Sequence, residues 1–171
     1  MIIPAILEQN IDSFNKKLEL LKQISKLKRV QVDFCDGEFV ENTSLTIDQI
    51  ENLPPKIEFE AHIMHKEPKN FAAYKNAGFS QIVVHYEAFS SELVMEEAIL
   101  DIKKLEMGVG VAINPETPVS TVRYFADTID HFTVMTVQPG KQGSEFLPES
   151  IERVEELRSI APDATIEVDG G

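Results

Sequence analysis

Apolar and polar positions follow two regular patterns along the chain. Short runs rich in Val, Ile and Phe are about the length of a strand. Longer segments between them repeat apolar residues every three or four positions, which is typical of a helix with one buried face. The runs lie at residues 2–7, 29–34, 57–64, 81–85, 108–113, 131–137 and 165–168, and the helical segments at 11–26, 47–52, 68–77, 91–105, 119–126 and 148–158.

This order of elements predicts an α/β protein with a parallel sheet. Strands separated by helical crossovers pair in parallel, because a tight turn cannot return the chain to the same end of the sheet. No linker or low-complexity stretch divides the chain, so residues 1–171 are expected to form one domain. The first strand lacks the Gly-x-Gly-x-x-Gly turn of a doubly wound dinucleotide-binding sheet, and a (β/α)8 TIM barrel is therefore favoured.

Composition narrows the function classes. The chain has 171 residues, 43% apolar and 26% charged, which is enough for one buried core. Its formal net charge of −13 excludes a nucleic-acid binder with a basic face and disfavours binding to an anionic membrane surface. No apolar stretch is long enough to span a membrane. With one cysteine, Cys35, and no signal-peptide pattern at its start, the chain is expected to be cytoplasmic.

Ionisable residues gather where several predicted strands end. Asp33, His62, His85 and Asp169 lie near the carboxyl ends of four strands, and in a parallel α/β fold those ends meet at one face. Alternation places Gln31 on the same face as Asp33, which in a barrel is the interior. Two carboxylates suit two-sided acid–base chemistry, and carboxylates with imidazole suit a divalent transition metal. Taken singly, each aspartate could equally cap a turn, and His85 fits a packing residue better than a ligand.

Two glycine-bearing loops offer a place for an anion. Residues 138–143 (QPGKQG) follow the sixth predicted strand and Gly170-Gly171 follows the seventh, where exposed backbone N–H groups can bind phosphate. Lys141 adds a positive charge to the first loop. Pro-Gly pairs also form ordinary turns, so the interpretation depends on the position of these loops after the strands.

Seven stretches, in order along nearly the whole chain, resemble the ribulose-phosphate 3-epimerase family. They are PAIL at 4–7, VDFCDGEFV at 32–40 with Asn42, AHIM at 61–64 followed by Glu67-Pro68, VHYE at 84–87, INPETP at 113–118, MTVQPG at 135–140 and IEVDGG at 166–171. The resemblance implies a (β/α)8 barrel that interconverts D-ribulose 5-phosphate and D-xylulose 5-phosphate by moving the proton at C3 through an enediolate.

The same resemblance assigns roles to particular residues. It implies that Asp33 and Asp169 form the acid–base pair and that both, with His62, bind one divalent ion such as Zn, Fe, Mn or Co. His62, Met64 and Met135 would also lie against the substrate. The residues implied to hold the phosphate are Gly140, Lys141, Gln142, Gly143, Gly170 and Gly171. Because members of the family commonly self-associate, a homo-oligomer is expected.

The chain departs from the family pattern at several of these positions. Gln31 stands where the family has the histidine of a His-x-Asp pair, so it is a weakened fourth metal ligand whose carbonyl oxygen replaces an imidazole nitrogen. Ala5 replaces a substrate-contacting serine and Cys35 a methionine, while Lys141 and Gln142 alter a Gly-Phe-Gly-Gly loop. The acid–base pair is retained and the metal site is eroded.

The number of predicted strands is one short of the family barrel. The sequence is therefore expected to be truncated, a single incomplete TIM-barrel domain over residues 1–171 without the eighth strand and the last helices. The loop after the eighth strand normally completes the phosphate site. An open barrel also leaves its first and last strands as free edges, which folded proteins avoid.

Three functions stay open at this point. The first is metal-dependent 3-epimerisation of a pentulose phosphate, supported by Asp33, Asp169 and the glycine loops. The second is a catalytically eroded sugar-phosphate binder, suggested by Gln31 and Ala5. The third is an epimerase for a related ketose phosphate such as allulose 6-phosphate, which the altered loop permits. In each case the partner is a small sugar phosphate, with neither nucleic acid nor membrane involved.

Overall fold

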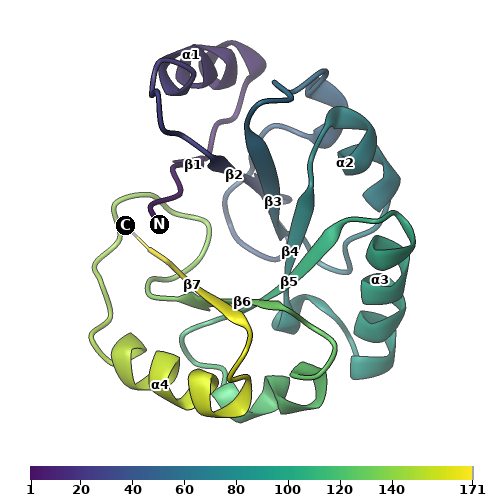
Figure 1. Cartoon of the computed structure of the whole chain (residues 1–171), viewed down its shortest axis with the longest axis vertical. Helices are drawn as coiled ribbons and strands as arrows, with labels where there is room; N and C mark the ends of the chain where they lie inside the picture. The colour runs from purple at the N-terminus through teal and green to yellow at the C-terminus, as the bar shows by residue number, and fades with distance from the viewer. Residues whose placement is uncertain (171) are drawn as a thin grey trace.

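One parallel sheet with helices along its outer side organises the chain, as Figure 1 shows for a computed structural model that describes residues 1–170. The strands are β1 (Ala5–Ile6), β2 (Arg29–Cys35), β3 (Glu58–Met64), β4 (Gln81–His85), β5 (Gly108–Ile113), β6 (His131–Met135) and β7 (Thr165–Asp169). They pair in parallel in the order β1 to β7. The predicted α/β class, the parallel pairing and the seven strands are confirmed.

The connections between strands are helices of two kinds. The α-helices are α1 (Ile11–Leu21), α2 (Phe71–Ala77), α3 (Glu92–Lys104) and α4 (Ser150–Ile160), and the 3₁₀ helices are η1 (Ile47–Gln49), η2 (Tyr86–Ala88) and η3 (Val119–Phe125). No helix within residues 1–170 is both long and apolar enough to cross a lipid bilayer.

Several predicted helix boundaries and types are wrong. Of the helix predicted over residues 119–126, Val119–Phe125 form a 3₁₀ helix instead of an α-helix, consistent with their β-branched Val and Thr residues, which disfavour α-helix. Residues 47–52 give only the short η1. The helix predicted from residue 68 begins at Phe71, because Asn70 adopts a left-handed conformation with φ of 60°. The first helix ends at Leu21, and Ile24, which fits its apolar stripe, is exposed.

The main hydrophobic core lies between the sheet and the helices. On β2 it takes alternate residues, Val30, Val32 and Phe34, and on β3 it takes Phe59, Ala61 and Ile63 in the same way. Helical residues from α1, α2 and α3 complete it. Because strand side chains alternate between faces, the residues in between these positions point to the other side of the sheet.

That other, inner face carries the buried polar residues of the strands. The buried polar residues of β2 to β6 all come from the inner positions, namely Gln31, Glu60, His62, His85, His131 and Thr133. The parallel register places Gln31 beside Glu60 and Asp33 beside His62 on neighbouring strands. Buried polar groups need hydrogen-bond partners, so these positions are suited to a network of polar contacts. A smaller apolar cluster of Leu7, Cys35 and Met64 lies beside them, at the carboxyl ends of β2 and β3.

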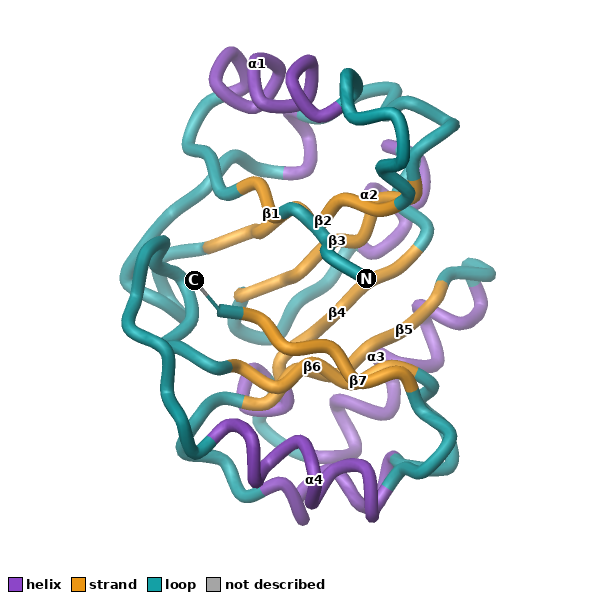
Figure 2. The backbone as a smooth tube through the Cα atoms, turned by 60° about the vertical axis from the view of Figure 1, so that its left-hand side comes forward, coloured by secondary structure: helices purple, strands orange, loops and turns teal. Residues whose placement is uncertain are grey.

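The sheet curls far enough to bring its two ends together. β2 and β7 are five places apart in the strand order, which corresponds to about 24 Å in a flat sheet. Yet Gln31 Nε2 of β2 lies 2.8 Å from Asp169 Oδ2 of β7. In Figure 2, β1 and β7 border the open side of the resulting half-barrel. This architecture matches a TIM-type barrel in which residues 1–170 supply seven strands and no eighth.

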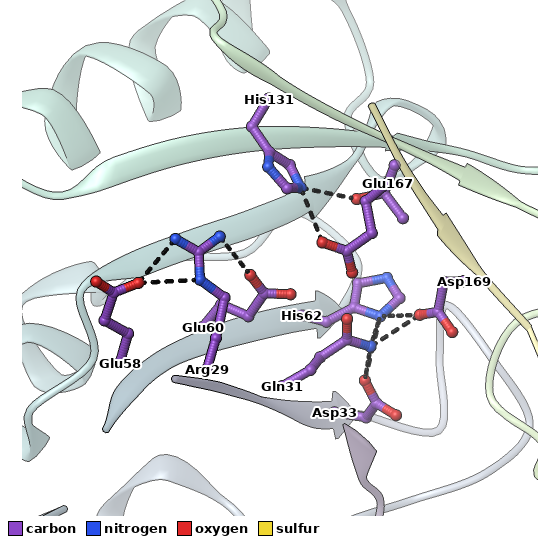
Figure 3. Close-up of polar contacts among 10 residues, drawn as sticks. Arg29, Gln31, Asp33, Glu58, Glu60, His62, His131, Glu167 and Asp169 are labelled. Atoms are coloured by element: carbon purple, nitrogen blue, oxygen red, sulfur yellow. Dashed lines mark hydrogen bonds and ion pairs between the residues drawn. The ribbon is translucent and has the colours of Figure 1, made fainter. Parts of the chain in front are cut away.

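A second polar layer fills the interior toward the amino ends of the strands (Figure 3). His131 Nε2 lies 3.3 Å from Thr133 Oγ1 and 3.5 Å from Glu167 Oε2. Burial, followed by the charge of Glu60, raises the pKa of Glu167 to about 8, so its contact with His131 is not an ion pair at neutral pH. Burial and the positive charge of Arg29 in turn lower the pKa of His131 to about 4.

We expect His131 to make the protein less stable in mild acid. The unfolded chain protonates this imidazole below a pKa of 6.5, whereas the folded chain resists protonation until about pH 4. The free energy of unfolding should therefore fall as pH drops through this window, by up to about 3 kcal/mol from this group. Urea unfolding across the window would show a flatter pH profile for His131→Gln than for the wild type, and parallel profiles would contradict the prediction.

Candidate active site

Four side chains from β2, β3 and β7 meet at the carboxyl end of the interior (Figure 3). Nδ1 of His62 lies 3.2 Å from Asp33 Oδ1 and 3.1 Å from Asp169 Oδ2. Gln31 donates from Nε2 to the same two carboxylates, at 2.8 Å in each case. Residues far apart in the sequence are therefore brought into direct contact, because the curled sheet places the ends of β2 and β7 on either side of β3's histidine.

The donor atoms of this cluster suit a divalent metal ion. Asp33, His62 and Asp169 each offer one ligand atom, and these atoms lie within 4.8 Å of one another. Two carboxylates and one imidazole form a donor set that transition metals accept, and three protein ligands leave coordination positions for substrate or water. Gln31 turns its amide nitrogen toward this group, and rotation of the amide by 180° would present the carbonyl oxygen, which can coordinate.

The pKa values of His62 and Asp169 each depend on the charge of the other residue. Burial opposes a charged His62, but hydrogen bonds and negative charge from Asp169 and Asp33 outweigh it and raise the His62 pKa to about 10. Burial likewise acts to raise the pKa of Asp169, and the contact with His62 outweighs it, so that this pKa is lowered. Without a bound metal, a protonated imidazole thus balances two carboxylates that would otherwise repel each other.

A cavity of about 80 Å³ opens beside the cluster, and most of the residues predicted to contact substrate line it. It is lined by Asp33, His62 and Asp169 together with Met64, Met135, Gly140, Lys141 and Gln142. It adjoins a wider cavity of about 340 Å³ between β1 and β7, with Asp33, Asp169 and Gln142 lining both. Together these cavities give a small polar ligand access to both carboxylates.

The predicted phosphate-binding residues do not all line the same cavity. Gly140, Lys141 and Gln142 line the smaller cavity, although the Lys141 amine is exposed and lies 3.8 Å from Glu41 Oε2. Gly170 lines the wider cavity, and Gly143 lines neither of the two. Gly171 lies outside the described residues.

The loop that carries Gly140 is fixed on both sides. Gly140 has φ of 84°, and a Cβ there would lie 2.8 Å from the Val40 side chain, so the position requires glycine. Asn42 donates to the Gly140 carbonyl at 3.0 Å, and Gln142 donates to the Leu7 carbonyl at 2.8 Å. The backbone of this loop is thereby held against the cavity.

Gly170→Ala is expected to destabilise the protein and displace Asp169. A Cβ at position 170 would clash with Thr136 Oγ1, the hydroxyl that donates to the Asp169 carbonyl at 3.0 Å. We expect a loss of about 1–3 kcal/mol in urea unfolding, typical of overpacking. Adding Thr136→Ala should recover part of this loss because it removes the clashing hydroxyl. An unchanged unfolding free energy for Gly170→Ala would refute the proposed clash.

His85 has a more polar environment than the packing role predicted from the sequence. His85 is fully buried, as a packing residue would be, and Phe39 packs on its ring with centroids 4.8 Å apart. However, its Nε2 also lies 2.8 Å from Nε2 of His62, so it contacts the polar cluster directly. Sequence analysis placed both histidines at the same end of the sheet but favoured a packing role for His85. It gave no role to Glu87, which lies behind His85 with Oε2 3.6 Å from Nδ1. The VHYE stretch was the available signal.

Comparison with known proteins identifies the family. The family model described as the ribulose-phosphate 3 epimerase family matches residues 1–171. Ribulose-phosphate 3-epimerase of Schizosaccharomyces pombe is 35% identical, with 99% of this chain and 75% of the relative aligned. The chloroplastic ribulose-5-phosphate-3-epimerase of Arabidopsis thaliana is 28% identical (100% and 63%), and the Synechocystis enzyme is 29% identical (100% and 76%).

The alignments also show how much of each relative this chain covers. The chain spans between 63% and 76% of the length of these three relatives. All three are named as epimerases, a class of isomerase, which confirms the enzyme class expected from the resemblance. The sequence match over the whole chain agrees with the parallel half-barrel and its cluster of strand-end residues. The chain therefore belongs to the ribulose-phosphate 3-epimerase family.

Proposed function

We propose that this protein interconverts D-ribulose 5-phosphate and D-xylulose 5-phosphate by proton transfer at C3. The observation that carries the proposal is the pair Asp33 and Asp169, whose oxygens lie 3.2 Å and 3.1 Å from the same nitrogen of His62. They come from strands on opposite sides of β3 in the curled sheet. Two carboxylates arranged in this way can serve the two faces of one carbon, which inversion of configuration at C3 requires.

In the proposed reaction one aspartate removes the C3 proton and the other, in its protonated form, delivers a proton to the opposite face. When bound by Asp33, His62 and Asp169, a divalent ion would supply electrostatic stabilisation of the negative charge that develops at the C2 oxygen. Met64 and Met135, both almost fully buried, provide apolar surface beside the reacting carbon. The loop at Gly140 and Lys141 would hold the phosphate through backbone N–H groups.

Release of deuterium from C3-labelled ribulose 5-phosphate tests the proposal. The protein is supplied in turn with Fe²⁺, Mn²⁺, Co²⁺ or Zn²⁺, and solvent exchange is followed by NMR. We expect exchange together with the appearance of xylulose 5-phosphate. Absence of exchange with every metal would contradict the proposal, and faster turnover of allulose 6-phosphate would assign the site to a six-carbon substrate instead.

Gln31 favours a second candidate, a sugar-phosphate binder that has lost catalysis. Its amide nitrogen already donates to both carboxylates, so it satisfies them where a cation would otherwise do so. This candidate predicts that calorimetry detects binding of ribulose 5-phosphate while no deuterium is released at C3. Activity that appears only in a Gln31→His variant would favour an eroded enzyme.

A further inference from the structure

Buried polar atoms without partners concentrate on one side of the active site. Within residues 1–170, six such side-chain atoms are found, and four of them belong to neighbouring residues: His85 Nδ1, Glu87 Oε2, Asn114 Oδ1 and Arg153 Nε. Burying a polar atom without a hydrogen bond is costly, so a cluster of them calls for a functional explanation. None of these four residues has a part in the proton transfer proposed above.

His85 and Glu87 extend a line of side chains that starts at His62, one of the candidate metal ligands. His62 faces Asp33 and Asp169 with Nδ1 and faces His85 with Nε2, 2.8 Å from the Nε2 of that ring. The ring planes are only 18° from parallel. On its other side, His85 Nδ1 lies 3.6 Å from Glu87 Oε2. That distance exceeds a hydrogen bond, but neither atom has a hydrogen-bond partner among residues 1–170.

The proton positions along this line follow from hydrogen-bond chemistry. Two nitrogens 2.8 Å apart need one proton between them, so one Nε2 donates and the other accepts. A carboxylate can only accept, so Glu87 selects the form of His85 that carries its proton on Nδ1. His85 Nε2 must then accept, and His62 Nε2 must donate. A cation that displaces the other proton of the metal-free imidazolium therefore meets the lone pair of His62 on Nδ1, the atom beside Asp33 and Asp169.

We propose that Glu87 and His85 are positioning residues that fix the tautomer and ring orientation of His62 so that Nδ1 is presented to the metal. This inference rests on the proposed function, because it assigns His62 as a ligand. Neither Glu87 nor His85 lines the 80 Å³ cavity, so the proposal gives them no contact with substrate. Residues that hydrogen-bond a metal-bound imidazole commonly set its orientation and basicity in this way.

The carboxylate of Glu87 is itself held from two directions. Its Oε1 accepts a hydrogen bond from the Asn114 backbone at 2.8 Å and another from the Thr117 hydroxyl. Arg153 of α4 donates to the carbonyls of Asn114, Pro115 and Thr117, each at 2.8 Å, which anchors that loop. With Oε1 occupied, Oε2 is the oxygen left to face His85. The line therefore runs from an outer helix through a loop to the candidate metal site.

Glu87→Gln is the informative variant because it keeps the size of the side chain and replaces one acceptor oxygen with an NH₂ donor. The amide oxygen can stay with Asn114 and Thr117, which leaves an NH₂ group facing His85 Nδ1. His85 would then accept at Nδ1 and carry its proton on Nε2, where it meets the proton on His62 Nε2. Two donors 2.8 Å apart repel each other, so the contact between the rings should break.

Imidazole nitrogen NMR of the metal-free protein tests the inference independently of catalysis. We expect His85 to carry its proton on Nδ1 in the wild type and on Nε2 in Glu87→Gln. Glu92→Gln is the matched control, since Glu92 is an exposed carboxylate nearby in the sequence that accepts a hydrogen bond from the Tyr86 hydroxyl. His85 protonated on Nε2 in the wild type, or unchanged in Glu87→Gln, would overturn the inference.

Metal competition against a chromophoric chelator supplies the second measurement. We expect Glu87→Gln to bind Mn²⁺ or Co²⁺ about 10- to 100-fold more weakly than the wild type, with Glu92→Gln unchanged. Equal affinity of Glu87→Gln and wild type would overturn the positioning role. A wild type that binds none of Mn²⁺, Co²⁺, Zn²⁺ and Fe²⁺ in this assay would contradict the metal-dependent function, while the NMR result would still decide the tautomer. If Glu87→Gln unfolds, Thr117→Val removes one hydrogen bond to Glu87 and should weaken metal binding in the same direction.

Discussion

Asp169→Asn is expected to reduce epimerisation of ribulose 5-phosphate by at least about 10²- to 10⁴-fold, the usual contribution of a general acid–base group. An amide neither accepts the C3 proton nor returns one, and it is a weaker metal ligand than a carboxylate. Asp169 is also the group whose charge, with that of Asp33, holds His62 protonated in the absence of metal. The rate of xylulose 5-phosphate formation measures the loss.

The two-base arrangement gives this experiment a sharper form. With one aspartate removed, the remaining one can still exchange the C3 proton of a single epimer without converting it. Asp169→Asn and Asp33→Asn should therefore lose interconversion together but retain deuterium exchange with opposite epimers. Asp163→Asn, an exposed aspartate ahead of β7, is the control. Retention of exchange with the same epimer in both variants would rule out separate faces for the two carboxylates.

Gln31→His is expected to tighten metal binding by at least about tenfold. Residues that only hydrogen-bond a metal ligand already change metal affinity by about 10- to 100-fold, and a direct ligand should have at least as large an effect. Imidazole supplies a nitrogen lone pair where the amide nitrogen now points hydrogens at Asp33 and Asp169. The change also frees both carboxylates from the hydrogen bonds that occupy them. Chelator competition with Zn²⁺, Co²⁺ and Mn²⁺ measures the affinities, and the gain should be largest for the ions that prefer nitrogen ligands.

A surface histidine provides the control for nonspecific metal binding. Gln23 is exposed in the turn after α1, and Gln23→His should leave the affinity at the active site unchanged. Equal affinities for Gln31→His and wild type would show that position 31 is not a metal ligand. In that case, the presence of Gln31 in place of the family's histidine would not explain weak metal binding.

Much of the fold follows from local pattern. Alternating apolar positions such as Val30, Val32 and Phe34 mark strands, and the helical stretches between them require parallel pairing. Helix ends and types were less predictable. The left-handed Asn70 delays α2, and a 3₁₀ helix replaces an α-helix over Val119–Phe125, because backbone conformation at such positions depends on how the segment packs.

For the site, the sequence alone determined the residue types and their place at strand ends, since alternation puts Gln31 and Asp33 on one face whatever the partner strands do. Which of these residues touch depends on the three-dimensional arrangement of the strands. The curl of the sheet brings Asp169 to Gln31, across strands that a flat sheet would keep far apart. It likewise sets His85 against His62 and Glu87 behind it, because contacts between strands depend on register and curvature, which no local pattern encodes.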